Sequence, residues 1–259
     1  MTSTDASRRR RRWPWLVALL VVAGLLVAAW FLADSVARDV ATSAVRTAVI
    51  QKLRLPADQK VDVDIEGMVI PQLIEGTFHD VRVASDGVPV GGTTADVTVR
   101  LNDIEYRGDT PGKMASGSAV VTVGQQQLRS LLDGADGIPA SSLVLRAPHV
   151  TASTKVTVFG TAVPIGIAMT PTAKAGALVL RPDSFTVGSA RMTAAALSGR
   201  FGSLVDGITR SRSVCIANRL PAGVSLTAVK VSGASLVADL AIDGDLAVDS
   251  ALQQKGSCS

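Results

Sequence analysis

Aromatic side chains are scarce in this 259-residue chain, which has three Trp, one Tyr and five Phe, or 3% of its residues. Outside an apolar N-terminal stretch, the aromatic residues are Phe78, Tyr106, Phe159, Phe185 and Phe201. A core with so few rings must be built from Val, Leu, Ile and Ala. Carbohydrate recognition by stacking on aromatic platforms is therefore disfavoured.

Groups that carry catalysis or bind metals are equally few. The two histidines, His79 and His149, belong to no metal-ligand spacing such as HExxH, and the two cysteines form no CxxC pair. A GxSxG nucleophile elbow and a GxxxxGK[ST] phosphate loop are also missing. We therefore expect no catalytic residue, no cofactor and no metal site, although an enzyme stays open as a minor alternative.

Carboxylates gather in two places and admit a calcium interpretation beside a simpler one. The residues concerned are Asp62, Asp64 and Glu66 in one segment and Asp239, Asp243, Asp245 and Asp249 in the other. In the first segment they alternate with apolar residues, as on the solvated face of a strand. The simpler interpretation, a wetted surface, is favoured at both places.

Positive charge is confined to the N-terminus. Residues 1–33 carry five Arg and one Asp, a net charge of +4, which equals the formal net charge of the whole chain. From Asp34 onward there are 21 Lys and Arg against 21 Asp and Glu. The larger part of the chain is thus formally neutral, and binding to nucleic acid through a basic face loses its support.

The N-terminus has the pattern of a membrane anchor. Five arginines at residues 8–12 precede a stretch, 13–33, that contains no charged residue. That stretch is long enough to cross the ~30 Å hydrocarbon core as a helix. Trp13, Trp15 and Trp30 lie near its ends, where indole rings favour the interface, and the arginines should remain cytoplasmic under the positive-inside rule.

A cleaved signal peptide is the alternative to this anchor. Its apolar core is typically ~7–15 residues, shorter than the stretch seen here, although small-residue sites near residues 28–33 would permit cleavage. Both interpretations place the rest of the chain outside the cytoplasm. There, an oxidising compartment permits a disulfide between Cys215 and Cys258, with two free thiols as the alternative.

The periodicity of the exported part predicts an α+β fold that is mainly antiparallel β. Residues 34–55 have helical spacing, with a stripe of Val36, Val40, Ala44, Ala48 and Val49, and Pro56 ends the segment. Alternating strands are expected at 61–66, 78–83, 96–101, 119–123, 143–145, 150–159, 161–169, 177–180, 184–190, 224–231 and 236–242. Short helices are expected at 125–132 and 194–208. The strands would present one apolar face that these helices cover only in part.

Three segments resemble actinobacterial LmeA-like phospholipid-binding proteins. Residues 220–231, LPAGVSLTAVKV, follow the family's LP-x-G-V-x-L-T-x-V-x-V run into a final strand, and residues 76–83, GTFHDVRV, are also similar. The entry TVG at 122–124 into a leucine-bearing helix is the third. The resemblance covers roughly residues 35–250. It implies a curved sheet packed on one long and one or two short helices, similar to tubular lipid-binding folds.

We therefore expect a lipid-binding protein of the cell envelope, held at the plasma membrane and holding acyl chains of a phospholipid in an apolar groove. The expected regions are a cytoplasmic basic tail (1–12), a transmembrane helix (13–33), an extracytoplasmic domain (34–250) and a C-terminal tail (251–259). Candidate lipid-contacting residues, chosen for apolar periodicity, are Val36, Val40, Val49, Leu128, Leu131, Leu197, Leu204 and Ile208. The alternative is a structural or interaction module of the envelope with a dry core. The sequence identifies no protein partner.

Overall fold

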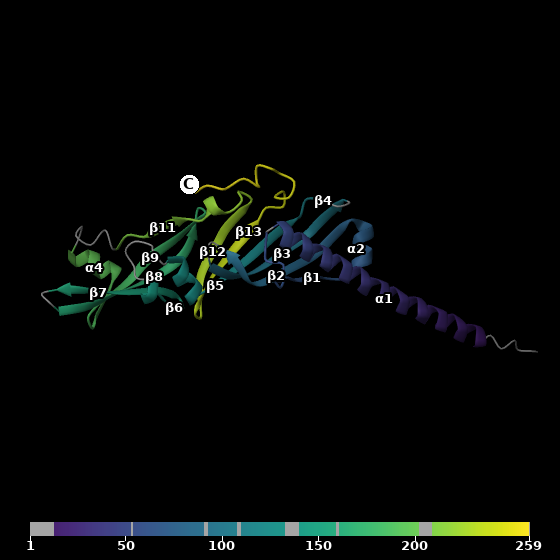
Figure 1. Ribbon diagram of the computed structural model, residues 1–259, viewed down its shortest axis with the longest axis horizontal. Helices are drawn as coiled ribbons and strands as arrows, with labels where there is room; N and C mark the ends of the chain where they lie inside the picture. The colour runs from purple at the N-terminus through teal and green to yellow at the C-terminus, as the bar shows by residue number, and fades with distance from the viewer. Residues whose placement is uncertain are drawn as a thin grey trace, which may run out of the picture.

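The computed structural model describes residues 13–52, 54–90, 93–107, 110–132, 140–158, 161–201 and 209–258. The basic tail, Leu204 and Ile208 lie outside these ranges. Within them the fold is mainly antiparallel β with few helices, and one long apolar helix stands at the N-terminus (Figure 1). The expected fold class is confirmed.

One continuous 40-residue helix, α1 (Trp13–Lys52), contains both the apolar stretch and the amphipathic segment that follows it. Every residue from 20 to 33 is exposed, and this half of α1 extends away from the sheets (Figure 1). It is long and apolar enough to cross a membrane, a property that an anchor and a signal sequence share. The helix ends shortly before Pro56, as predicted.

The second half of α1 packs on the first strands through small side chains. The packed residues are Ala37, Ala41, Val45, Val49 and Ile50. Val36 and Val40, which we expected to cover the sheet, are instead 62% and 65% exposed, so that part of the stripe prediction is wrong. The packing stripe is displaced by one residue because the polar contacts of Asp34, Arg38 and Arg46 fix the rotation of the helix.

Those polar contacts satisfy the free edge of the larger sheet. Among the residues that the structure describes, strand β1 (Asp62–Ile65) pairs only with β2, so the carbonyl groups on its outer edge face no further strand there. The Arg46 Nε atom donates to the Val61 carbonyl at 2.8 Å, and the Arg38 guanidinium donates to the carbonyls of Ile65 and Gly67. Helix α1 therefore covers an edge that would otherwise be open to other chains.

The larger sheet has seven strands among the described residues. Its order is β1, β2 (Thr77–Val90), β3 (Thr93–Arg107), β5 (Ser116–Gly124), β13 (Ser235–Ile242) and β12 (Val224–Ser232), and the short β4 (Thr110–Pro111) pairs with β3. All neighbours are antiparallel. Strand β13 thus lies beside β5, although more than a hundred residues separate these two strands in sequence.

The smaller sheet contains six described strands. Its order is β10 (Ala190–Thr193), β9 (Ala177–Val187), β8 (Thr161–Lys174), β7 (His149–Val158) and β6 (Val144–Arg146), and β11 (Arg212–Cys215) pairs with β9. The remaining short elements are α3 (Gln125–Leu132), α4 (Ala194–Phe201) and two 3-10 turns, Ala140–Ser142 and Ala217–Arg219. Helices α3 and α4 begin at the residues where the sequence predicts helices to begin.

A seven-residue helix, α2 (Val69–Glu75), was not predicted. Its capping residue Met68 offers no side-chain hydrogen bond, but the Asp34 carboxylate on α1 accepts one from the Ile70 amide at 2.9 Å. Gly76, at φ 75°, ends the helix in the left-handed region that favours glycine. A cap supplied from a distant helix leaves no local signal in the sequence.

The two sheets meet along β12 (Figure 1). Val231 on β12 packs into a buried cluster with Leu145, Val150 and Met169 of the smaller sheet and with Leu143, which directly precedes β6. A second cluster joins Leu226, Val229 and Leu240 of the larger sheet to residues from β8, β9 and the 217–220 turn. These contacts close the β12 end of the larger sheet, as α1 closes the β1 end.

The C-terminal segment is tied back over this junction. Cys215 and Cys258 form the predicted disulfide, with Cα atoms 5.9 Å apart. Backbone hydrogen bonds fix the segment as well, from Gly223 to the Leu252 carbonyl at 2.9 Å and from Gly256 to the Leu220 carbonyl at 3.0 Å. A structural disulfide is typical of domains that fold outside the cytoplasm.

Candidate functional site

One face of the larger sheet is apolar across its long strands, except at the buried Ser85 of β2, which is paired with Val97. Residues paired across antiparallel strands have their side chains on the same face. The pairs that share this face are Ile65–Val81, Val83–Val99, Val97–Val121, Ala119–Leu240, Val121–Ala238, Ala238–Val229 and Leu236–Val231. The alternation predicted for the individual strands therefore adds up to a single continuous apolar surface.

The two ends of this surface are buried. At the β1 end, Val61, Ile65 and Val81 are no more than 4% exposed beneath α1. At the β12 end, Val229 and Val231 are 9% and 6% exposed beneath the smaller sheet and its neighbouring turn. Both ends are ordinary packed core.

Between the buried ends lies a half-buried stretch that we call the central strip. It consists of Val97, Val99, Leu101, Ala119, Val121 and Ala238 on β3, β5 and β13. All six are apolar, and all are intermediate in exposure. The central strip is thus the part of the apolar face that neither α1 nor the smaller sheet covers completely.

The close approach of strands at one end of the central strip depends on Gly117. A Cβ atom at this position would lie 2.9 Å from the Ile242 Cβ atom and 3.0 Å from the Leu101 Cδ2 atom. Leu101 and Gly117 are paired across β3 and β5. The missing side chain leaves the space that the Leu101 and Ile242 side chains occupy beside Gly117.

The opposite face of the same strands is polar. Arg100, Ser118 and Val120 are exposed there, next to the Lys230–Asp239 ion pair at 3.6 Å. Val120 and Val121 are consecutive residues on β5, so they point to opposite faces. This pair provides matched positions for testing the central strip.

The structure does not bring the candidate residues of the sequence analysis onto one surface. Val49 packs in the cluster under α1, and Leu128 packs at the junction of the sheets. Leu197 is buried at 7% exposure on α4, which lies against β9 and β10. Val36 and Val40 point outward, the Leu131 side chain is outside the described set, and lipid contact by any of these residues stays a prediction.

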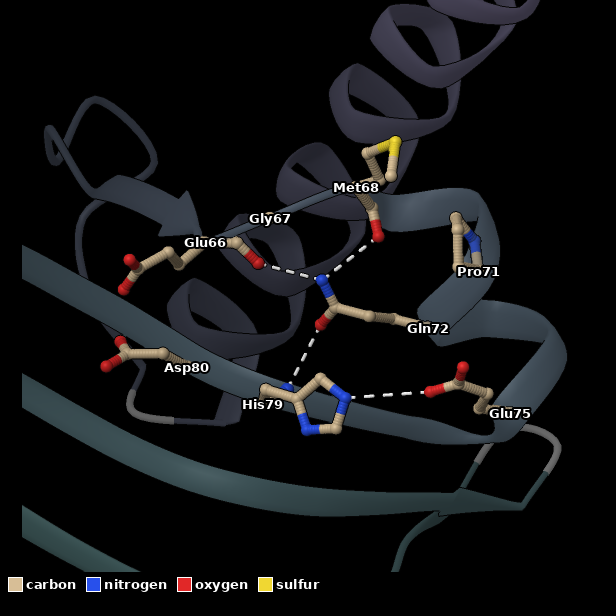
Figure 2. A pocket seen from close by; sticks show the side chains of 8 residues that line it. All are labelled: Glu66, Gly67, Met68, Pro71, Gln72, Glu75, His79 and Asp80. Atoms are coloured by element: carbon tan, nitrogen blue, oxygen red, sulfur yellow. Dashed lines mark hydrogen bonds and ion pairs between the residues drawn. The ribbon is translucent and has the colours of Figure 1, made fainter.

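A shallow pocket of about 380 Å³ lies beside α2 and is lined by Glu66, Gly67, Met68, Pro71, Gln72, Glu75, His79 and Asp80 (Figure 2). The Gln72 side chain is buried there, at 5% exposure, and both its amide nitrogen and its amide oxygen are hydrogen-bonded. Its Nε2 atom donates to the carbonyls of Glu66 at 2.7 Å and Met68 at 3.0 Å, and its Oε1 atom accepts from the His79 amide at 3.0 Å. The polar groups of this pocket thus hold α2 on β2.

His79 is the most strongly paired titratable side chain of this region. Its Nδ1 atom lies 2.9 Å from an Asp103 carboxylate oxygen, and its Nε2 atom lies 3.6 Å from Glu75 (Figure 2 shows the second contact). The hydrogen bond to Asp103 raises the pKa of His79 above its usual 6.5, against a smaller lowering by desolvation. The charge of Asp103 and then the contact with Glu75 raise it further. The group is exposed, so the pairing is an interaction at the surface.

A second polar cluster lies on the smaller sheet. The Thr170 hydroxyl donates to Asp183, and the His149 Nδ1 atom lies 3.2 Å from Thr170 and 3.4 Å from Asp183. Because the hydroxyl is already bonded to the carboxylate, this is not the nucleophile–base–orienter order of a hydrolase. Across the described residues, no group of three or more His, Cys, Asp or Glu is placed to hold a metal ion.

The sequence contained part of the signal for the central strip. The expected strands at 96–101 and 119–123 include five of its six residues, but periodicity alone does not say which strands lie at the centre of a sheet. Helical stripes, in contrast, have a spacing that the sequence shows by itself. The order of the strands was the missing information, since it determines what α1 and the smaller sheet can cover.

Comparison with known proteins identifies a family that matches this chain. No significant match was found among curated proteins or among solved structures. A family model described as LmeA-like phospholipid-binding matches residues 32–241, far more than half of the chain and nearly all of the described sheets. The match includes every residue of the central strip and begins at the end of the apolar half of α1. The chain therefore belongs to the LmeA-like phospholipid-binding family.

Proposed function

We propose that this protein is a membrane-anchored, non-catalytic phospholipid-binding protein that holds acyl chains against the central strip. The observation that carries the proposal is a continuous apolar face that is buried at both ends and half-buried in the middle. Family membership supports a phospholipid as the ligand. Each CH₂ group removed from water contributes about 0.8 kcal/mol, so an acyl chain is held without any catalytic group.

The proposed arrangement places residues 1–12 in the cytoplasm, residues 13–33 across the plasma membrane and residues 34–250 outside it, followed by the tail at 251–259. The arginines at 8–12 support this orientation through the positive-inside rule, and the Cys215–Cys258 disulfide supports an extracytoplasmic domain. Intact-mass measurement of protein extracted from membranes tests retention of the helix. A mass that lacks residues 1–33 would replace the anchor by a signal peptide.

A photoreactive lipid tests the central strip directly. The full-length chain is reconstituted into lipid nanodiscs that contain a phospholipid with a diazirine on its acyl chain, and the labelled peptides are identified by mass spectrometry. We expect labelling of β3, β5 and β13 in addition to α1. The apolar half of α1 serves as an internal control for insertion, because it contacts lipid whether or not the strip does.

Two single substitutions on β5 provide the matched comparison. Val121→Asn places an amide in the central strip at a cost of about 1 kcal/mol or more, which lowers labelling of the strip about fivefold. Val120→Asn introduces the same group on the opposite face and should leave labelling unchanged. Labelling restricted to α1, or equal labelling in both variants, would contradict the proposal and favour an interaction module with a dry core.

A further inference from the structure

The region around α2 has an exposed apolar surface that the fold does not explain. Met68 is 50% exposed, Leu73 is 43% exposed and Ile74 is 78% exposed. Residues 67–74, GMVIPQLI, contain no charged side chain. Val69 and Gln72 of the same helix are buried, so α2 is firmly seated and still presents its larger apolar side chains to solvent.

Contacts of Asp34 and Arg38 fix the position of α2 along α1. The Asp34 carboxylate accepts the hydrogen bond from the Ile70 amide and lies 3.7 Å from Arg38, which also donates to the Ile65 and Gly67 carbonyls. Asp34 is the first charged residue after the uncharged stretch at 13–33. Helix α2 therefore lies at the level where the apolar half of α1 ends, on the side of the sheet from which that half emerges (Figure 1).

The sole tyrosine of the chain is next to α2. The Tyr106 amide donates to the Gly76 carbonyl at 2.8 Å, and the Tyr106 ring packs edge-on against Phe78 with centroids 6.2 Å apart. The ring remains 37% exposed. Tyrosine is enriched where apolar and aqueous phases meet, because one end of its ring is apolar and the other is polar.

Charge at the margin of this surface is moderate. The nearby carboxylates include Glu66, Glu75, Asp80 and Asp103, of which Glu75 and Asp103 face His79. Electrostatic attraction to anionic lipids is therefore not the expected driving force. Apolar side chains beside an aromatic ring, at the level of a membrane-spanning helix, are the pattern of a segment that inserts shallowly into an interface.

We propose that the α2 face, defined by Met68, Leu73, Ile74 and Tyr106, rests in the leaflet through which α1 passes, among the glycerol groups and upper acyl chains. The inference rests on the anchor of the proposed function but not on the central strip. It adds a second contact between the domain and the membrane. With two contacts, the domain has a fixed side facing its lipid source.

Depth-dependent fluorescence quenching tests the α2 face in the full-length chain. The native cysteines are joined in a disulfide, so a new cysteine is the free thiol available for an environment-sensitive dye. The three positions are Ile74→Cys on the α2 face, Leu25→Cys within the apolar half of α1 and Val187→Cys on β9 as the matched control. All three native side chains are exposed, so each substitution leaves the packing intact.

Each labelled protein is reconstituted into phosphatidylcholine vesicles that carry a nitroxide at a shallow or a deep acyl position. We expect I74C to lose most of its fluorescence to the shallow nitroxide, L25C to lose most to the deep one, and V187C to lose little to either. Quenching of L25C with an I74C signal equal to that of V187C would overturn the α2 contact and leave the anchor standing.

Two further outcomes would also overturn the proposed contact between the α2 face and the membrane. Absence of quenching at L25C would refute the anchor and the α2 contact together. Disulfide dimers formed by unlabelled I74C under an added thiol oxidant, with no quenching of the labelled protein, would show that a second copy of this chain covers the α2 face, which also overturns the proposal. Photolabelling of the central strip is measured separately, so a failure there leaves the quenching result interpretable.

Discussion

The ends and the middle of the larger sheet differ in cover although they share one apolar face. Beneath α1, Ile65 is 1% exposed, while Val99, two strands away on the same face, is half-buried. The residue types are alike, so composition does not explain the difference. What differs is the neighbour, because α1 and the smaller sheet bury the two ends completely and cover the middle only in part.

The disulfide ties the C-terminal segment over the β12 end of the larger sheet. We expect its removal to lower the free energy of unfolding more than the other changes below. The Cys215→Ser/Cys258→Ser double variant frees a loop closed over 43 positions, which the chain-entropy model values at roughly 4 kcal/mol of unfolding free energy. Urea unfolding of the full-length chain in detergent checks this. An equal stability with and without reductant in the native protein would contradict the expectation.

Truncation at the β1 end should cost more than truncation in the middle. Ile65→Ala removes a buried side chain beneath α1 and should lower the unfolding free energy by roughly 2–5 kcal/mol. Val99→Ala removes half-buried methyl groups in the central strip and should cost about 1 kcal/mol or less. Both are measured by the same urea titration without added lipid. Similar costs at both positions would mean that the central strip is already packed core.

The contact between α1 and α2 should have an intermediate effect. Asp34→Ala leaves the Ile70 amide without its acceptor and Arg38 without its carboxylate, which should cost about 1–2 kcal/mol. Asp34→Asn keeps an acceptor oxygen and should cost less. Hydrogen exchange of the α2 amides separates the two variants. Unchanged protection of these amides in Asp34→Ala would show that α2 is held by packing alone.

Protonation of His79 should have the smallest effect. Because folding raises the pKa of this group, its pairing stabilises the protein fully below about pH 6.5 and is lost as the pH rises through the higher folded-state value. The pKa is followed by NMR titration in the native protein and in Asp103→Asn, which removes the larger contribution. A His79 pKa that does not fall in Asp103→Asn would assign the shift to Glu75.

Much of the fold can be predicted from the local pattern of apolar and polar residues. The rotation of α1 about its axis cannot be predicted in this way. Val36 and Val40 form one stripe along the helix, and Ala37 and Ala41 form another beside it, with the same spacing. Hydrophobicity favours the valines. The structure uses the alanines, because Arg38 and Arg46 reach the carbonyls of an edge strand that lies far from them in sequence. Long-range polar contacts selected between two stripes of equal period.

The same reason explains why the sequence alone predicts neither α2 nor the central strip. Seven residues that include Pro71 hold no helical signal of their own, and their cap comes from Asp34 on another helix. The central strip exists only after β13 has inserted next to β5. The disulfide was predictable, since two cysteines in an oxidising compartment leave a single pairing within the chain.

The uninterrupted course of α1 has a mechanical consequence. Residues 34–52 extend about 28 Å at 1.5 Å per residue, with no hinge between them and the apolar half. In the proposed membrane arrangement the helix acts as a stiff lever. A tilt of its apolar half within the bilayer therefore rotates the sheet by the same angle. Bilayer thickness, which sets the tilt of a spanning helix, would then adjust the height and orientation of the central strip.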